Sequence, residues 1–408
     1  MDFSRADASS EVPPQYTPST PSPKYSSTPL PGEEQVATSQ RVPTPTRTGS
    51  FRRITDKVTV VLRDQLPGSV QPIYGRHGFI CGYLVLHDIT DLVEVSIKLV
   101  GIKSLGITAF GTAVKSIFLE ESYTMWTASS AEPCPDTIPF ALVWPPTFSD
   151  AGQTRPIPPS YKCEGLSSSL SYEFTVTLSK RKQLLGFLKP MDSVSIPLTY
   201  LPRIRPPAPM IPSELPFMST VKSSPEEWHQ IMCSMQSVYS SDLAAIQCCL
   251  FIPAVQIFAL SDAIPFHIQF HGPEASLRYL RGSDGLLEGG EIQICVSLKR
   301  RTMTKVLDSK AQHTRVIGEG RIATVKSRSQ SRLDGSHALD CDGELTIDHS
   351  SEVPIRAPSF SISDVAVRDL IVLELKPLQP LKSPFIEMIQ EHPIRLVTDP
   401  WTEEPHPA

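Results

Sequence analysis

The stretch VEVSIKLVG, residues 93–101, decides the fold class of this chain. Four apolar residues in it alternate with glutamate, serine and lysine: Val93, Val95, Ile97 and Leu99. Side chains of a strand point to opposite faces in turn, so this period of two sends one face to a core and the other to water. The stretch therefore predicts a strand of an antiparallel sheet.

The same period recurs along the chain, most clearly in SYEFTVTLS (171–179) and EIQICVSLKR (291–300). Further strand-like runs include KVTVVLRD, GFICGYLVL, IPFALVW, SVSIPLTYL, IPFHIQF and VRDLIVLELKP, separated by Pro, Gly and Ser. Short strands without alternating helices predict an all-β fold of antiparallel, immunoglobulin-like β-sandwiches. One short helix is expected in SPEEWHQIMCSMQSV (224–238), with Ser224 as its N-cap.

Composition limits the partners and the compartment. The chain has 408 residues and a net charge of −5, so bulk charge gives no reason to expect nucleic acid as a partner. The start, MDFSRADASSEV, lacks the apolar core of a secretory signal, and no run reaches the roughly 18 apolar residues of a membrane span. We therefore expect a cytoplasmic protein. The eight cysteines form no C-x-x-C pair, which favours reduced, buried thiols over the alternatives of a zinc site or disulfides.

Proline and serine divide the chain into four parts. Residues 1–53 are rich in Pro, Ser and Thr and offer too little apolar surface to offset the entropy of ordering, so we expect a disordered tail. A proline-rich stretch at 201–216 predicts an extended linker. Two sandwiches are then expected at 54–200 and 217–400. The stretch VKSRSQSRLDGSHALDCDG (325–343) predicts a long loop that is flexible or functional.

Several of these stretches together resemble the arrestin-like family, in particular the fungal arrestin-related trafficking adaptors. The resemblance lies in GFICGYLVLHDITDLVEVSIKLVGI, in TIPFALVWPPTF followed by IPPSY and LSYEFTVTL, and in FSISDVAVRDLIVLELKP. It spans most of residues 57–400 and is weaker in the second half. These are packing patterns without a catalytic signature, so they indicate a fold more directly than a task.

The resemblance implies two sandwiches joined by a linker and a non-enzymatic role in trafficking. Members of the family recognise integral membrane transporters or receptors as cargo. They recruit WW-domain, HECT-type ubiquitin ligases through P-P-x-Y motifs, which directs the cargo to endocytosis. A cytoplasmic location at the plasma membrane or endosomes would follow from that role.

Two P-P-x-Y motifs occur in the chain. Pro13, Pro14 and Tyr16 lie in the proline-rich tail, where consecutive prolines preform the polyproline II helix that a WW domain binds. We predict that these residues dock a ligase, weakly, because a single copy brings no avidity. Pro158-Pro159-Ser160-Tyr161 lies at the family's corner motif, so we predict a structural role for it.

Several hydroxyl residues are candidate phosphorylation sites. Those followed by proline suit proline-directed kinases: Thr17, Thr20, Ser22, Thr28 and Thr44. Ser50 and Ser331 each have arginine three residues before them, which suits basic-directed kinases. A phosphate on Thr17 would add about −1.5 to −2 charge beside Tyr16 and weaken or retune docking. The alternative is that such patterns in Ser-rich sequence go unused.

Two basic clusters are candidate contacts for anionic lipid: Lys180, Arg181 and Lys182, and Lys299, Arg300 and Arg301. The alternative, which we favour, is that they are solvated strand ends. The sequence contains no catalytic motif, phosphate-binding loop or metal-ligand spacing, so we expect neither an enzyme nor a cofactor.

Two other functions stay open. One is a structural arrestin-like subunit of an endosomal sorting complex, similar to retromer, which would form a stable assembly without a ligase. The other is a β-sandwich that binds a small ligand, which predicts a concave pocket lined by aromatic residues.

Overall fold

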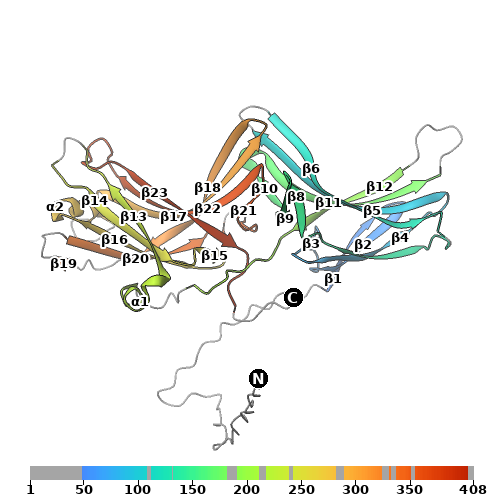
Figure 1. The fold of residues 1–408 in the computed structure, drawn as a ribbon, viewed down its shortest axis with the longest axis horizontal. Helices are drawn as coiled ribbons and strands as arrows, with labels where there is room; N and C mark the ends of the chain where they lie inside the picture. The colour runs from blue at the N-terminus through green and yellow to red at the C-terminus, as the bar shows by residue number, and fades with distance from the viewer. Residues whose placement is uncertain are drawn as a thin grey trace, which may run out of the picture. The chain divides into compact units, whose positions relative to one another are not determined.

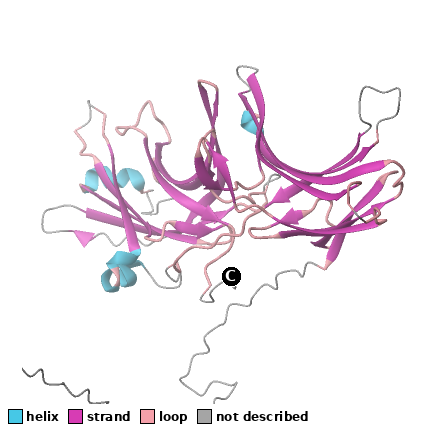
Figure 2. Ribbon diagram, turned by 45° about the vertical axis from the view of Figure 1, so that its right-hand side comes forward, coloured by secondary structure: helices cyan, strands magenta, loops and turns pink. Residues whose placement is uncertain are grey.

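Strands dominate the fold in a computed structural model, coloured by secondary structure in Figure 2. The structure describes residues 48–107, 112–130, 132–181, 191–210, 217–238, 242–281, 289–323, 330–331, 337–350 and 354–402. The mostly-β class predicted from the period of two is confirmed.

Two sheets come from the first half of the described residues (Figure 1). One has the order β1-β2-β4-β7, with bounds β1 Gly49–Ile54, β2 Val58–Gln65, β4 Phe79–Leu86 and β7 Thr137–Val143. The other has the order β3-β12-β11-β5-β6, with bounds β3 Ile73–Tyr74, β12 Met191–Tyr200, β11 Ser168–Lys180, β5 Leu92–Ile107 and β6 Thr112–Thr127. β10 (Tyr161–Cys163) pairs with β11, and β8 (Thr147–Asp150) pairs with β9 (Gln153–Pro156).

A larger sheet, here called the third sheet, comes from the second half, with the order β13-β14-β16-β20-β18-β17-β22-β23-β15. Its strands are β13 Trp228–Met235, β14 Ile246–Pro253, β15 Ile257–Ala259, β16 Ile264–Gly272, β17 Ile292–Val306, β18 Ser309–Ile322, β20 His337–Ile347, β22 Val365–Pro377 and β23 Met388–Val397. β19 (Gln330–Ser331) pairs with β20, and β21 (Phe360–Ser361) pairs with β22.

Helices are short and lie between strands. They are α1 Phe217–Ser223 and α2 Glu274–Leu277, with single 3-10 turns η2 Glu164–Leu166, η3 Pro225–Glu227 and η4 Arg278–Leu280. No helix among the described residues has the length and apolarity needed to cross a membrane.

The hydrophobic core follows the alternation seen in the sequence. In β5, Val95, Ile97 and Leu99 are buried and Val93 is half-buried. Val95, Ile97 and Leu99 join residues of β2, β4 and β11 in one cluster, here called the first core, while the apolar face of the third sheet forms a separate second core. Burying each such side chain contributes about 1.5–3 kcal/mol, so the period of two is the main determinant of these sheets.

The helix predicted in residues 224–238 is wrong. The Ser224 side chain makes no cap hydrogen bond, the helical turn ends at Glu227, and β13 begins at Trp228. β13 pairs antiparallel with β14 and buries Ile231 and Met235. Long-range pairing therefore overrides a local cap signal, as tertiary context often does.

Other predicted boundaries differ from the structure. β1 begins at Gly49 and pairs with β2, so strand structure starts inside the predicted tail of residues 1–53. Residues 1–47 lie outside the described residues, so the prediction of a disordered tail falls mostly outside them. Within the predicted loop of residues 325–343, β20 begins at His337 and pairs with β16.

The predicted linker has no regular structure over its described residues, 201–210. It is held to the end of β23: Ile204 N donates to Thr398 Oγ1 at 2.8 Å, and Arg203 pairs with Asp399. The division into domains at 54–200 and 217–400 stays a prediction.

Several polar contacts join strands of the first half to the segment just before β22, within the compact unit of residues 47–408. Ser363 donates from its backbone N and its Oγ to Asp150, at 2.7 and 2.6 Å. Lys103 forms an ion pair with Asp364. Nearby, β10 lies beside β17, where the Tyr161 hydroxyl contacts Thr302, and the candidate site lies there.

Candidate functional site

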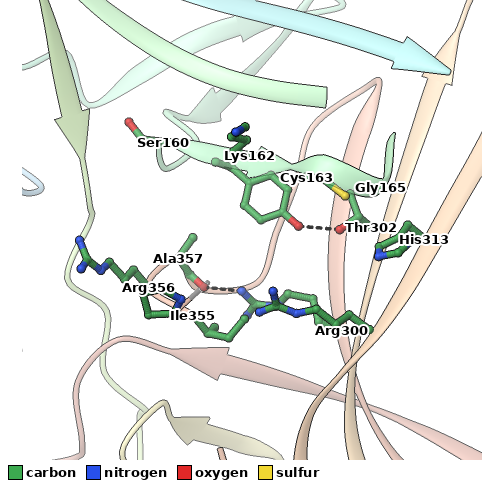
Figure 3. Close-up of a pocket in the computed structure, with 13 residues that line it drawn as sticks. Ser160, Lys162, Cys163, Gly165, Arg300, Thr302, His313, Ile355, Arg356 and Ala357 are labelled. Atoms are coloured by element: carbon green, nitrogen blue, oxygen red, sulfur yellow. Dashed lines mark hydrogen bonds between the residues drawn. The ribbon is translucent and has the colours of Figure 1, made fainter. Parts of the chain in front are cut away.

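A cavity of about 360 Å³ lies between β10, the hairpin β17–β18 and the segment 354–357 (Figure 3). Five of the residues that line it are basic: Lys162, Arg300, His313, Arg315 and Arg356. Among the described residues that line it, none is acidic. We call it the basic cavity. A concave site lined by one sign of charge concentrates ions of the opposite sign.

The Pro-Pro-Ser-Tyr corner positions one wall of the basic cavity. Pro158 and Pro159 are buried, and the Pro158 carbonyl accepts a hydrogen bond from the Tyr172 hydroxyl at 2.5 Å. Ser160 N donates to the Tyr200 carbonyl at 2.8 Å, and Tyr200 N donates to Ser160 Oγ at 2.9 Å. The structural role predicted for this second P-P-x-Y copy is confirmed, and the corner places Tyr161 at the cavity.

Tyr161 links this wall to β17. Its hydroxyl lies 2.6 Å from Thr302 Oγ1, a contact drawn in Figure 3. Burial raises the pKa of Tyr161, so its phenol keeps its proton. Nearby, a Cβ at Gly165 would lie 2.6 Å from His313 Nδ1, which explains why glycine is needed where β18 approaches.

Arg300 forms the floor of the basic cavity. It lies directly opposite Asp369 across β17 and β22, and its Nε and one terminal nitrogen donate to the two carboxylate oxygens at 2.7 and 2.9 Å. The other terminal nitrogen donates to the Ala357 carbonyl at 2.9 Å (Figure 3). Arg300 is only 5% exposed and Asp369 0%. Arg300 is therefore neither the solvated strand end that the sequence favoured nor an exposed lipid contact, because its charge lies inside the protein, in the middle of β17.

The rest of the lining supplies charge at the mouth of the basic cavity. Lys162, His313 and Arg356 are exposed, and Arg315 is half-buried. These side chains come from three separate elements that surround one space. Such an arrangement supplies positive charge and N–H donors, the properties of an anion-binding site.

The other predicted lipid contacts are not brought together with Arg300. Lys299 pairs with Glu374 and Arg301 with Glu391, each at 2.6 Å, on the face of the strand opposite to Arg300. Lys180 pairs with Asp88 at 2.6 Å at the end of β11. The neighbouring Arg181 is exposed, and Lys182 lies outside the described residues.

Most of the predicted docking and phosphorylation residues lie outside the described residues: Pro13, Pro14, Tyr16, Thr17, Thr20, Ser22, Thr28 and Thr44. Ser50 is exposed on β1. Ser331 lies in β19, and its side chain is outside the description.

Sequence reasoning missed the basic residues that join Arg300 at the basic cavity: Lys162, His313, Arg315 and Arg356. They lie in three stretches far apart along the chain, and no spacing connects them. Within the described residues no group of His, Cys, Asp and Glu is placed to hold a metal ion. The eight cysteines are free thiols, and four of them are buried. No protein-family model matches this chain, and no curated protein matches it.

Proposed function

We propose that this chain is a non-enzymatic trafficking adaptor that links membrane-protein cargo to a WW-domain, HECT-type ubiquitin ligase. The proposal includes two arrestin-like, immunoglobulin-like sandwiches as the folded body and a cytoplasmic location at the plasma membrane or endosomes. The observation that carries it is the motif Pro13-Pro14-Gln15-Tyr16 in a Pro/Ser/Thr-rich tail.

The burial of the second motif, Pro158-Pro159-Ser160-Tyr161, supports docking of the ligase at the first motif. A WW domain clamps both prolines between aromatic rings and takes the tyrosine into a second pocket. Pro158 and Pro159 are buried, and the Tyr161 hydroxyl contacts Thr302, so that copy cannot be bound without unfolding the corner. Ligase docking through P-P-x-Y would therefore fall on Pro13, Pro14 and Tyr16.

The folded body supports the arrestin-like part of the proposal through its strand content and its two cores. The first core draws mainly on the two sheets of the first half, with Val306 and Val365 joining it from the third sheet, and the second core draws on the third sheet. The extended stretch 201–210 lies between them in sequence. Contact with anionic membrane would rest on few side chains, because Lys180, Lys299 and Arg301 are already in ion pairs.

The small-ligand alternative predicted a pocket lined by aromatic residues. The basic cavity has the phenol of Tyr161 and five basic side chains in its lining, which does not fit that prediction. The sorting-complex alternative predicts a stable assembly that does not depend on Tyr16. The WW-domain capture experiment described next therefore separates it from the adaptor.

The test is capture of the full-length chain by immobilised WW domains of a HECT ligase. We expect Tyr16→Ala to reduce capture to background, because the tyrosine pocket is left empty. Tyr161→Phe is the matched control for the second motif and should be captured like the unchanged chain. Phosphorylation of Thr17 should weaken or retune capture through its added charge. Equal capture of the unchanged chain and Tyr16→Ala would reject the proposal and favour the sorting-complex subunit.

A further inference from the structure

Two cysteines face each other at one edge of the third sheet. Cys233 of β13 lies directly opposite Cys248 of β14, and β13 comes first in the strand order of that sheet (Figure 1). We propose that the two thiols form a modification site, which hydrogen peroxide converts reversibly into a disulfide. This site is independent of the adaptor role, because it involves only β13 and β14.

The backbone geometry of the pair fits a disulfide. Residues directly opposite each other in an antiparallel pair have Cα atoms about 4.5–5.5 Å apart, and disulfides join Cα atoms about 4.4–6.8 Å apart. Both side chains point to the same face of the sheet, toward the second core. The Cys248 thiol donates a hydrogen bond to the Cys233 sulfur, so the two sulfur atoms already lie side by side. Closing the bond therefore needs only a small approach of the edge strand.

Among the cysteines that the structure describes, no other two lie directly opposite each other. Cys295 lies opposite Glu374, and Cys341 lies opposite Ile268. Cys341 shares the second core with Cys248, but β16 lies between their strands. Two strand spacings separate those backbones by about 9–10 Å, which is beyond the reach of a disulfide. Oxidation should therefore select the pair Cys233–Cys248.

Exposure gives the two thiols different roles. Cys233 is half-buried at the sheet edge, whereas Cys248 is only 1% exposed. The hydrogen bond from Cys248 lowers the pKa of Cys233, against the effect of burial, and the same hydrogen bond together with burial raises the pKa of Cys248. A thiolate that solvent reaches, next to a second thiol, is the arrangement typical of a peroxide-sensing cysteine. Cys233 is therefore the thiol that reacts with peroxide, and Cys248 is the resolving thiol.

The oxidation proceeds in two balanced steps. The Cys233 thiolate attacks one oxygen of hydrogen peroxide, an S–O bond forms, the O–O bond breaks, and the departing hydroxide takes up a proton and leaves as water. The Cys248 sulfur then attacks the sulfenic sulfur of Cys233. The S–S bond forms, the S–O bond breaks, and the hydroxide leaves as water with the proton of the Cys248 thiol. The two sulfurs lose the electron pair that the peroxide gains, and a thiol reductant returns it by exchange through a mixed disulfide.

The test treats reduced full-length protein with hydrogen peroxide at neutral pH. Remaining thiols are blocked with iodoacetamide, the chain is cleaved at Asp242, between the two cysteines, and the peptides are mapped by mass spectrometry without reduction. We expect two peptides joined through Cys233 and Cys248, and dithiothreitol should separate them. Cys233→Ser should abolish the link. Cys295→Ser is the matched control and should leave it unchanged, because Cys295 is likewise half-buried in the third sheet but faces Glu374.

Cys248→Ala separates the two steps. Without the resolving thiol, the sulfenic acid should accumulate on Cys233, where dimedone labels it. Two outcomes would overturn the proposal. One is oxidation of Cys295 while Cys233 and Cys248 stay free. The other is a link between Cys233 and Cys248 that forms only in urea-unfolded protein. Both are measured on the unchanged chain, so they hold even where a variant fails to fold.

Discussion

Arg300 and His267 occupy similar places in the third sheet, since each lies directly opposite an aspartate on the neighbouring strand. Arg300 of β17 faces Asp369 of β22, and His267 of β16 faces Asp342 of β20. His267 Nδ1 lies 2.6 Å from Asp342 Oδ1, and its Nε2 lies 3.4 Å from Asp340 Oδ1. Both basic side chains are buried, but only the arginine has a partner that is buried as well.

The difference lies in what each pair exposes to solvent. Asp369 is 0% exposed, whereas the side chains of Asp342 and Asp340 are 52% and 30% exposed. The histidine face is covered instead by Phe217 of α1, whose ring stacks on it at a centroid distance of 3.9 Å. The arginine pair is thus enclosed by protein on both sides, while the histidine pair reaches solvent through its two aspartates. The contribution of the arginine pair to the unfolding free energy should therefore change on mutation, and that of the histidine pair should also change with pH.

Removing one partner of the closed pair should have the largest effect. Arg300→Met leaves the Asp369 carboxylate buried, with the Ser359 hydroxyl as its remaining side-chain donor. An uncompensated buried charge costs about 3–5 kcal/mol. We expect the free energy of unfolding, measured by urea titration at neutral pH, to fall by that amount.

The double variant Arg300→Met/Asp369→Leu is the control. Replacing both charges by apolar side chains of similar volume is often neutral or stabilising. It should therefore restore most of the loss, although it would remove the floor of the basic cavity. A double variant as unstable as Arg300→Met would show that the pair acts through packing and not through its charges.

The histidine pair should produce a pH dependence. Burial opposes the charged ring, but the hydrogen bonds to Asp340 and Asp342 outweigh it, so the pKa of His267 is raised above its usual 6.5. A raised pKa means that the stabilisation is fully present below pH 6.5 and is lost as the pH rises through the folded-state value. Hydrogen bonding to His267 holds the pKa of Asp340 below 3.8, so its own contribution is lost only in acid.

His267→Gln tests this sign. Charge-assisted hydrogen bonds contribute about 1.5–3 kcal/mol, and we expect the variant to lose roughly that much at pH 6. The difference in unfolding free energy between the two proteins should shrink as the pH rises from 6 to 9. Subtracting the two curves cancels other titrations, including that of His392, whose pKa burial lowers. A difference that stays constant with pH would mean that folding does not change the pKa of His267, and one that grows with pH would mean that its pKa is lowered.

The sequence predicted the strands of Arg300, Asp369 and His267, but it placed Asp340 and Asp342 in a loop that the structure shows as part of β20. It predicted neither pair. Alternation placed residues 291–300 and 367–377 in strands because the period of two is local. Arg300 and Asp369 meet only through the pairing of β17 with β22, which nothing within either stretch specifies. Arg300 was therefore predicted, together with its neighbours Lys299 and Arg301, to lie at a solvated strand end, with contact to anionic lipid as the other candidate role. The basic cavity could not be predicted for the same reason, since its residues converge through tertiary structure alone.

A local helix signal gave a wrong prediction where pairing with a neighbouring strand competed with it. The Ser-Pro-Glu-Glu start at residue 224 is a good helix signal, yet β14 was available to pair with the residues after it. The Pro-Pro-Ser-Tyr corner shows the reverse case. There the rigid prolines agree with the hydrogen bonds of Tyr172 and Tyr200, and the prediction from sequence is confirmed.

An exposed ion pair, Lys98–Glu120, should contribute the smallest stabilisation of the pairs compared. Lys98 Nζ lies 2.6 Å from Glu120 Oε1 between β5 and β6, and the two side chains are 46% and 47% exposed. Water screens such a pair and its ordering costs side-chain entropy, so it contributes about 0.2–1 kcal/mol. Lys98→Gln should lower the unfolding free energy by that small amount, and the loss should vanish in about 1 M salt, where the Debye length is short. The loss for Arg300→Met should persist in the same salt, because no ion reaches Asp369. If both losses faded equally, burial would not be what separates the closed pair from an exposed one.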